Sequence, residues 1–186
     1  MLDGQWWYID RHLTLDGTRA CAYATVLDCI RDGVTTIFDH HASFCEIPGS
    51  LFAIKDVCQE LGIRANLCYE VSERDGAEKC GQAIRENADF ARWAKEQDDD
   101  MIKAMFGGHA LFTISDKTFE QMVKANDGMT GFHIHVAEGM NDVYDSLQNY
   151  GRRPVQRLQD HGILGPKTIL GHCIHCLLYT SPSPRD

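Results

Sequence analysis

The sequence has no long hydrophobic run, no glycine-rich phosphate loop and no excess of positive charge. Its apolar runs fall well short of the roughly 20 residues that a transmembrane helix needs. A net charge of −9 argues against nucleic acid or an anionic membrane surface as the main partner. The opening residues MLDGQWWYID are not typical of a signal peptide, because they carry an early aspartate and no basic flank. We therefore expect a soluble, cytoplasmic protein.

A compact disulfide framework is also missing, although the chain has eight cysteines. Free cysteine behaves as a small buried hydrophobe, and nothing in the sequence points to an oxidising compartment. We expect reduced cysteines in a core or pocket rather than disulfides. Six of them are scattered through periodic apolar segments: Cys21, Cys29, Cys45, Cys58, Cys68 and Cys80.

The last eleven residues, CLLYTSPSPRD, change character abruptly and are rich in serine and proline. They resemble the translation of a sequencing adaptor joined to a truncated gene, and such scars are best excluded from fold reasoning. We expect one domain over residues 1–175 and a non-native tail over residues 176–186. The alternative is that HCIHC, residues 172–176, forms a compact zinc cluster with C-x-x-C spacing.

The rest of the chain alternates helical and strand-like stretches, which predicts an α/β fold with parallel strands and right-handed crossovers. Hydrophobic periodicity and end signals locate each stretch. The expected strands are residues 34–39, 63–71, 101–107, 131–138 and 167–172, and the expected helices are residues 10–32, 49–61, 77–97, 115–126 and 152–161.

Two architectures fit this alternation, a doubly wound sheet and a (β/α)8 barrel. A nucleotide-binding doubly wound sheet normally carries a G-x-G-x-x-G or Walker sequence, and neither occurs here. Histidines and acidic residues instead recur where strands end, as catalytic groups do in barrels. A complete barrel takes about 250 residues. We therefore predict a partial (β/α)8 TIM barrel of about five strands, truncated at both ends.

The segment GFHIHVAEGM, residues 131–140, carries the most chemical information. Side chains alternate along a strand, so His133 and His135 share a face, and Glu138 follows where the strand ends. A neutral imidazole is a good zinc or iron ligand, and a nearby carboxylate can move a proton from water to a substrate nitrogen. The alternative is a polar strand end. His133 is either a second ligand or an interior histidine with a structural role.

Other histidines also follow strands. His172 ends the strand after GFHIHVAE, which makes it a neighbour of His135 in a parallel barrel. His109, in GGHALFTIS, contacts either a substrate or only its own loop. Of His40 and His41, at most one can face the barrel interior, because neighbouring side chains point to opposite faces.

These residues bear a resemblance to a known family. GFHIHVAEG followed by YGRRPVQRLQDHGILGPKTILGHCIH resembles the fifth and sixth strand regions of the amidohydrolase superfamily, in its cytosine/guanine deaminase and chlorohydrolase branch. GVTTIFDHHAS and GGHALFTIS extend the resemblance, which covers residues 1–175 in order.

The resemblance implies roles for four residues. His135 would be a ligand of a single divalent metal, zinc or alternatively iron, and Glu138 the acid/base that shuttles protons. His172 would orient the hydrolytic water, and His109 would contact the substrate. The implied reaction is hydrolytic deamination of a small heterocyclic or amidine compound by metal-activated water. The sequence leaves open whether the protein forms a homo-oligomer.

The family's first-strand H-x-H ligand pair and last-strand aspartate are absent from the sequence. We therefore expect the chain as given to bind metal weakly and to be inactive. A related hydrolase that releases chloride or opens a cyclic amide is the nearest alternative. A non-catalytic α/β binding module with structural histidines is the alternative from another class.

Overall fold

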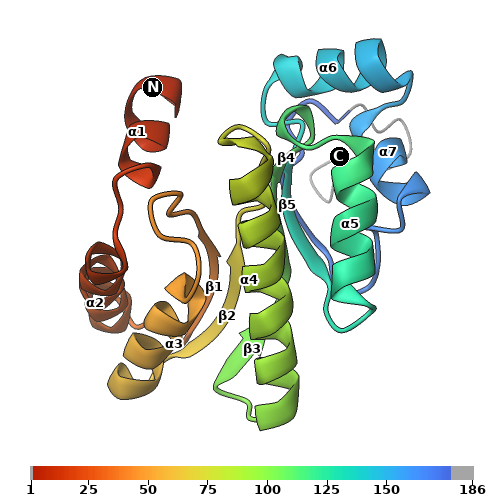
Figure 1. Ribbon diagram of the computed structural model, residues 1–186. Coiled ribbons are helices and arrows are strands. Elements are labelled where there is room, and N and C mark those ends of the chain that lie inside the picture. The colour runs from red at the N-terminus through yellow and green to blue at the C-terminus, as the bar shows by residue number, and fades with distance from the viewer. Residues whose placement is uncertain (1, 177–186) are drawn as a thin grey trace.

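The computed structural model describes residues 2–176 and forms a curved sheet of parallel strands (Figure 1). Backbone pairing divides the sheet into two three-stranded halves, ordered β1-β2-β3 and β4-β5-β6. A parallel bridge between Val71 and Gly108 joins the halves, and the His109 amide donates to the Val71 carbonyl at 2.9 Å. The strands are β1 (Thr36–His41), β2 (Arg64–Tyr69), β3 (Ile102–Ala104), β4 (Phe106–Ala110), β5 (Phe132–Val136) and β6 (Ile169–His172).

Strands that follow one another in sequence are therefore neighbours in space. A doubly wound sheet would instead reverse its strand order at a switch point. Among residues 2–176 the sheet stays open. The prediction of a partial (β/α)8 barrel is confirmed.

The expected strand at residues 101–107 is divided at Met105 because the chain changes partners there. β3 pairs with β2, and the Met105 amide still donates to the Leu67 carbonyl at 3.1 Å. The next amide, that of Phe106, donates to the Gly131 carbonyl at 2.9 Å, and β4 then pairs with β5. Strand 101–107 thus becomes the two short strands β3 and β4, which connect the two halves of the sheet.

Helices α3 (Ser50–Leu61) and α4 (Gly76–Gln97) pack on the outer face of the sheet, α3 against β2 and α4 against β2, β3 and β4 (Figure 1). All five expected helices are present, with ends within a few residues except at the first. That helix begins at Leu15, where the Thr14 hydroxyl accepts a hydrogen bond from the Gly17 amide as an N-cap. The helices are α1 (Trp7–Asp10), α2 (Leu15–Arg31), α3 (Ser50–Leu61), α4 (Gly76–Gln97), α5 (Asp116–Asn126), α6 (Met140–Tyr150) and α7 (Pro154–Asp160), with a π-helical turn η1 (Leu2–Trp6) and a 3-10 turn η2 (Leu111–Thr113).

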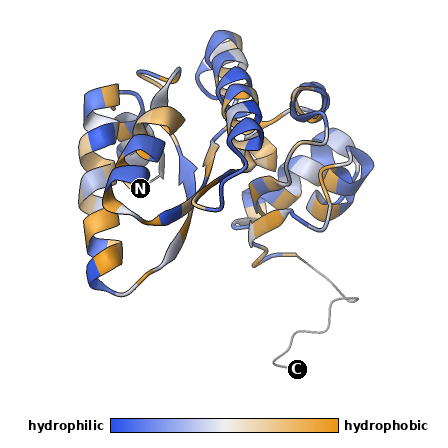
Figure 2. Ribbon diagram, turned by 90° about the horizontal axis from the view of Figure 1, so that it is seen from below, coloured by the Kyte–Doolittle hydropathy of each residue, from blue (hydrophilic) through white to orange (hydrophobic). Residues whose placement is uncertain are grey.

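The core lies between the helices and the outer face of the sheet. Leu51, Val57, Leu67, Phe90 and Ile102 are fully buried there. Apolar and polar residues alternate around the helices, as amphipathic packing on a sheet requires (Figure 2). All eight cysteines are free, as expected, but Cys21 and Cys45 are exposed, so the expected core or pocket position is wrong for these two. No helix among the described residues is long and apolar enough to cross a membrane.

The expected tail at residues 176–186 lies outside the described residues, except for Cys176. The HCIHC stretch can be followed only as far as this residue. Within residues 2–176, its histidines and cysteines do not bring three donor atoms within ligand distance of one another.

Candidate functional site

Histidines from two strands, β1 and β5, face one another across the inner surface of the sheet. The His40 ring, at the end of β1, lies 4.7 Å from the His133 ring and 4.4 Å from the His135 ring between centroids. His133 and His135 share the inner face of β5, as the strand pattern predicts. His41 points the other way, with its Nε2 2.9 Å from the Ser43 hydroxyl. The expectation that only one of His40 and His41 faces inward is confirmed.

The backbone fixes the direction of the His135 ring. Its Nδ1 lies 2.9 Å from the carbonyl oxygen of His109, so Nδ1 carries the proton and donates. Nε2 is then the atom with a free lone pair. Burial lowers the pKa of His135, which favours the neutral ring that a metal requires. Fixing one ring nitrogen on a carbonyl is the usual way that proteins orient a histidine ligand.

His109 is buried in the wall of the same pocket. Its Nδ1 lies 2.9 Å from the Thr113 hydroxyl, which itself donates to the Ala110 carbonyl. Burial, with a smaller contribution from the charge of Arg74, lowers the pKa of His109 to about 3. His109 is therefore a neutral hydrogen-bonding group near pH 7 rather than a source of protons.

Glu138 and His172 approach each other beyond the ends of β5 and β6. The Glu138 Oε2 lies 3.7 Å from the His172 Nε2, and the His172 ring centroid is 5.3 Å from that of His135. The Glu138 side chain is 63% exposed and can therefore reach both water and a bound molecule. The four residues predicted from the sequence thus surround one region at the carboxyl end of the sheet.

The backbone beside Glu138 is held in an unfavourable conformation. Ala137 has φ +48°, in the left-handed region that non-glycine residues rarely adopt. The buried Asp142 carboxylate accepts the Ala137 amide at 2.7 Å and the Phe112 amide at 2.9 Å. Asp142 therefore ties the loop after β5 to the turn after β4. His172 also has a positive φ, +65°.

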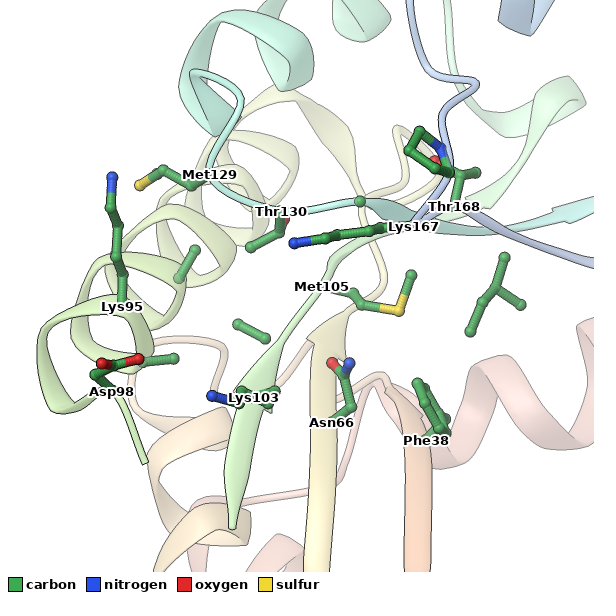
Figure 3. A pocket seen from close by; sticks show the side chains of 16 residues that line it. Phe38, Asn66, Lys95, Asp98, Lys103, Met105, Met129, Thr130, Lys167 and Thr168 are labelled. Carbon is green, nitrogen blue, oxygen red and sulfur yellow. The ribbon is translucent and has the colours of Figure 1, made fainter. Parts of the chain in front are cut away.

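A pocket of about 450 Å³ lies at this end of the sheet, and its walls include His109, His135 and Glu138. The rings of Trp6 and Phe112 give it two aromatic sides. A larger pocket of about 650 Å³ lies toward the amino ends of the strands, near Phe38 and Lys103 (Figure 3). Barrel proteins place their chemistry at the carboxyl ends, which selects the smaller pocket.

Cys68 and Glu70, on and just after β2, also reach this inner face, and the sequence reasoning missed both. Glu70 is 8% exposed, and one of its oxygens lies 2.5 Å from Arg74. Burial raises the pKa of Glu70 to about 7 against the opposing charge of Arg74. The missed signal was the alternation Asn66, Cys68, Glu70, a polar face on a strand whose other face is apolar.

Two groups of donor atoms at this face lie within 4.8 Å of one another and could hold a metal ion. One is His40, Glu70 and His135, and the other is His40, Cys68 and His133. The Nε2 atom of His40 is buried and has no hydrogen-bond partner among the described residues. Neutral imidazoles, a carboxylate and a thiol are suitable ligands for zinc, so the residues fit a divalent metal.

The chain is a barrel-type α/β protein with parallel strands in sequential order, and imidazole and carboxylate groups that could hold a metal lie at the carboxyl ends of these strands. The amidohydrolase family model matches residues 5–183. The chain belongs to the amidohydrolase family.

Relatives of this chain include deaminases of adenosine-type compounds. The chain is 28% identical to 5-methylthioadenosine/S-adenosylhomocysteine deaminase of Thermoanaerobacter pseudethanolicus, over 91% of this chain and 38% of the relative. It is 31% identical to 5'-deoxyadenosine deaminase of Methanobrevibacter smithii, over 90% of this chain and 37% of the relative. The chain therefore spans well under half the length of these curated relatives.

Solved structures share the fold. An adenosine deaminase from Xanthomonas campestris with bound zinc superposes with a TM-score of 0.76 at 21% identity, over 91% of this chain and 37% of that one. The zinc complex of the atrazine chlorohydrolase TrzN from Arthrobacter aurescens gives 0.72 at 20% identity, over 90% and 40%. These two proteins, which share the fold, each hold zinc.

Proposed function

We propose that these residues are part of a metal-dependent aminohydrolase that hydrolyses the C–N bond of a small heterocyclic amine or amidine. The observation that carries the proposal is the placement of Glu138 in one pocket with His135 and His109, 3.7 Å from His172. The names of the relatives, deaminases of adenosine-type compounds, support a heterocyclic substrate.

The metal would be zinc, or alternatively iron, and His135 would hold it through Nε2. When bound, a divalent metal supplies Lewis acidity, which lowers the pKa of water from about 16 to about 7. The chain's contribution is to present a neutral ring in a fixed direction. The hydrogen bond from Nδ1 to the His109 carbonyl and the lowered pKa of His135 supply both conditions.

Glu138 would carry the proton. Its carboxylate accepts a proton from the attacking water as the new C–O bond forms, and delivers it to the ring nitrogen of the substrate. Glu138 would then transfer the second proton of the water to the amino group. The C–N bond breaks, and the amino group leaves as ammonia. Asp142 holds the backbone beside Glu138, which keeps the carboxylate at the pocket.

His172 and His109 would position the reactants. The Nε2 of His172 faces the Glu138 oxygen, where it can hold the attacking water by a hydrogen bond. The His109 ring, neutral near pH 7, offers a hydrogen bond to the substrate, and Trp6 and Phe112 provide flat apolar walls for a heterocycle.

Glu138→Gln tests this proposal in the polypeptide encoded by the uninterrupted gene that contains these residues. Loss of the proton carrier should lower ammonia release from a panel of heterocyclic amines by about 10²–10⁴-fold, with bound metal unchanged. Glu120→Gln, at an exposed position on α5, is the matched control and should leave the rate unaltered. The readouts are ammonia release and metal content per chain.

Each other outcome points elsewhere. Full activity in Glu138→Gln would contradict the assigned role of the carboxylate. Chloride release without ammonia release would favour a chlorohydrolase. Binding of heterocycles without turnover, unchanged by Glu138→Gln, would favour a binding module with structural histidines.

A further inference from the structure

We propose that His40, Cys68 and His133 form a second metal site, a thiolate-containing Zn²⁺ site deeper in the barrel than His135. The three side chains come from β1, β2 and β5, so a bound ion would link the two halves of the sheet across the inner face. None of the three belongs to the residues given to the reaction above.

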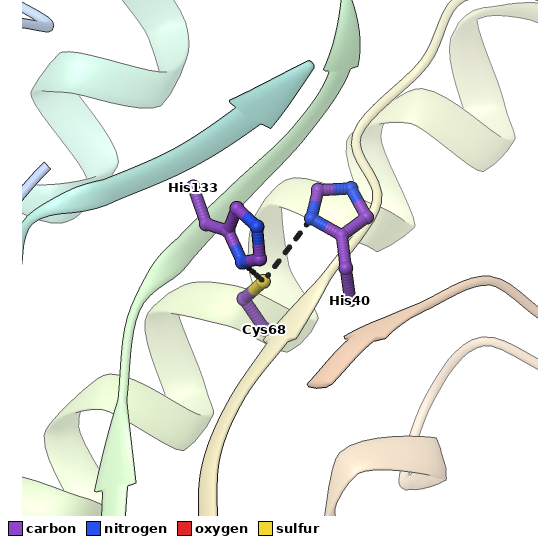
Figure 4. A group of neighbouring side chains, drawn as sticks. All are labelled: His40, Cys68 and His133. Atoms are coloured by element: carbon purple, nitrogen blue, oxygen red, sulfur yellow. Dashed lines mark hydrogen bonds between the residues drawn. The ribbon is translucent and has the colours of Figure 1, made fainter. Parts of the chain in front are cut away.

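The distances suit a single tetrahedral ion. The Cys68 Sγ lies 3.6 Å from the His40 Nδ1 and 3.7 Å from the His133 Nδ1 (Figure 4). Zinc–sulfur and zinc–nitrogen bonds of ordinary length at a tetrahedral angle place sulfur and nitrogen about 3.5 Å apart. Figure 4 shows both rings turned toward the sulfur from opposite strands. The ligand atoms therefore already stand near the positions that the ion would require.

The three donor groups also suit coordination. Each ring presents one nitrogen to the sulfur, at 3.6 Å for His40 and 3.7 Å for His133. Cys68 is buried, and its thiol donates a weak hydrogen bond to the Asp39 carbonyl at 3.3 Å. Binding would form the Zn–S bond and release the thiol proton to the buffer, since a thiolate is the ligand.

The second nitrogen of His40 supports the same assignment. Its Nε2 has no hydrogen-bond partner among the described residues and lies 3.8 Å from the Glu70 Oε2. Histidine ligands commonly donate their other N–H to a carboxylate. With Nδ1 on the ion, Nε2 would carry a proton and face Glu70, which Arg74 holds through its other oxygen. Water would fill the fourth position.

This site changes one expectation from the sequence. The absence of the family's first-strand ligands predicts weak metal binding. A His₂Cys set within this chain supplies binding of its own, and its sulfur gives it a signature that a histidine and carboxylate site lacks.

Cobalt titration of the metal-free 186-residue chain tests the proposal. Co²⁺ bound to thiolate absorbs in the near ultraviolet by charge transfer, whereas Co²⁺ on nitrogen and oxygen ligands does not. We expect this band to saturate at one Co²⁺ per chain, to disappear on Zn²⁺ addition, and to be lost in Cys68→Ser. Zn²⁺ should also raise the urea midpoint of the wild-type chain, because binding stabilises the folded state.

Two further variants keep the test decisive. His133→Gln leaves every thiol in place and should weaken Co²⁺ binding by about tenfold or more. The double variant Cys173→Ser, Cys176→Ser removes the C-x-x-C pair of the sequence, which could also bind Co²⁺ through sulfur. This variant should retain the band. Circular dichroism verifies folding of each variant. Absence of the band in the folded wild-type chain, its survival in Cys68→Ser, or its loss in the double variant would overturn the proposal.

Discussion

Gly107 and Gly108 are neighbours in β4 but have very different surroundings. A Cβ atom on Gly107 would lie 2.2 Å from the Tyr69 carbonyl oxygen, which belongs to the backbone of β2. A Cβ atom on Gly108 would meet only side-chain ends, the nearest being Met122 Cε at 3.1 Å. Backbone has little freedom to move in a packed sheet, whereas a methionine end has several rotamers. Gly107 is thus required where the two halves of the sheet meet.

Gly107→Ala should therefore be the more damaging of two matched changes. We expect it to lower the free energy of unfolding by about 3 kcal/mol or more, because the seam between β2 and β4 must open. Gly108→Ala should cost about 1 kcal/mol. Urea denaturation of both variants measures the difference. Equal losses would show that the close approach at Tyr69 does not hold the halves together.

Single residues at the site were predictable where their direction followed from strand alternation. This argument placed His133 and His135 on one face and separated His40 from His41. It could not supply distances between strands, because these depend on register between segments far apart in the sequence. Cys68 lies 65 residues from His133, and only the folded sheet brings the two together.

The first turn of helix α5 is stabilised by Glu73, a residue that lies outside the helix. The Ser115 hydroxyl accepts a hydrogen bond from the Thr118 amide as an N-cap. Glu73 in turn accepts the Ser115 amide at 2.8 Å and the Ser115 hydroxyl at 2.5 Å. Burial alone would raise the pKa of Glu73. These hydrogen bonds to the carboxylate outweigh burial, so the pKa of Glu73 lies below its usual value.

Glu73→Gln should weaken this cap in a pH-dependent way. The folded-state pKa of Glu73 lies below its unfolded value, so its contribution is complete above about pH 4.5 and is lost as pH falls through the folded-state value. We expect a loss of about 1 kcal/mol at pH 7 that shrinks below about pH 4. Urea midpoints of both proteins between about pH 7 and about pH 3 give the comparison. A pH-independent difference would argue against the carboxylate as the cause.

The elements themselves were largely predictable, since apolar periodicity, N-caps and terminal glycines mark them. Helix α6 was missed although Met140, Val143, Tyr144 and Leu147 repeat at helical spacing. Three of these four side chains are exposed, and only Val143 is buried, so the repeat marks no continuous buried face. The division of β3 from β4 had no local signal, because it results from a change of pairing partner.

The molecule as a whole presents one strand edge with an apolar side chain. Among the described residues β1 pairs only with β2, and Phe38 on its inner face is 55% exposed. Exposed edges with apolar side chains favour pairing with other chains. The 186-residue chain should therefore self-associate through this edge.

Phe38→Lys should reduce that association, because an inward-pointing charge opposes edge-to-edge pairing. We expect a lower apparent mass at high protein concentration. The free energy of unfolding, measured by urea denaturation, should change by less than about 0.5 kcal/mol. Tyr144→Lys, at an exposed position on α6, is the matched control. Light scattering and analytical ultracentrifugation supply the masses. Equal association in both variants would place the contact elsewhere.

The left-handed backbone at Ala137 links the stability of the fold to the proposed role of Glu138. A glycine there would adopt φ +48° without the steric cost that alanine bears, so the folded chain would gain stability. Glycine would keep the amide that donates to Asp142, but it would widen the range of conformations open to the peptide beside Glu138. Alanine at position 137 makes the fold less stable than glycine would, but it restricts the peptide beside Glu138 more. If Glu138 has the proposed role, a stable fold and a fixed carboxylate would therefore favour different residues at position 137.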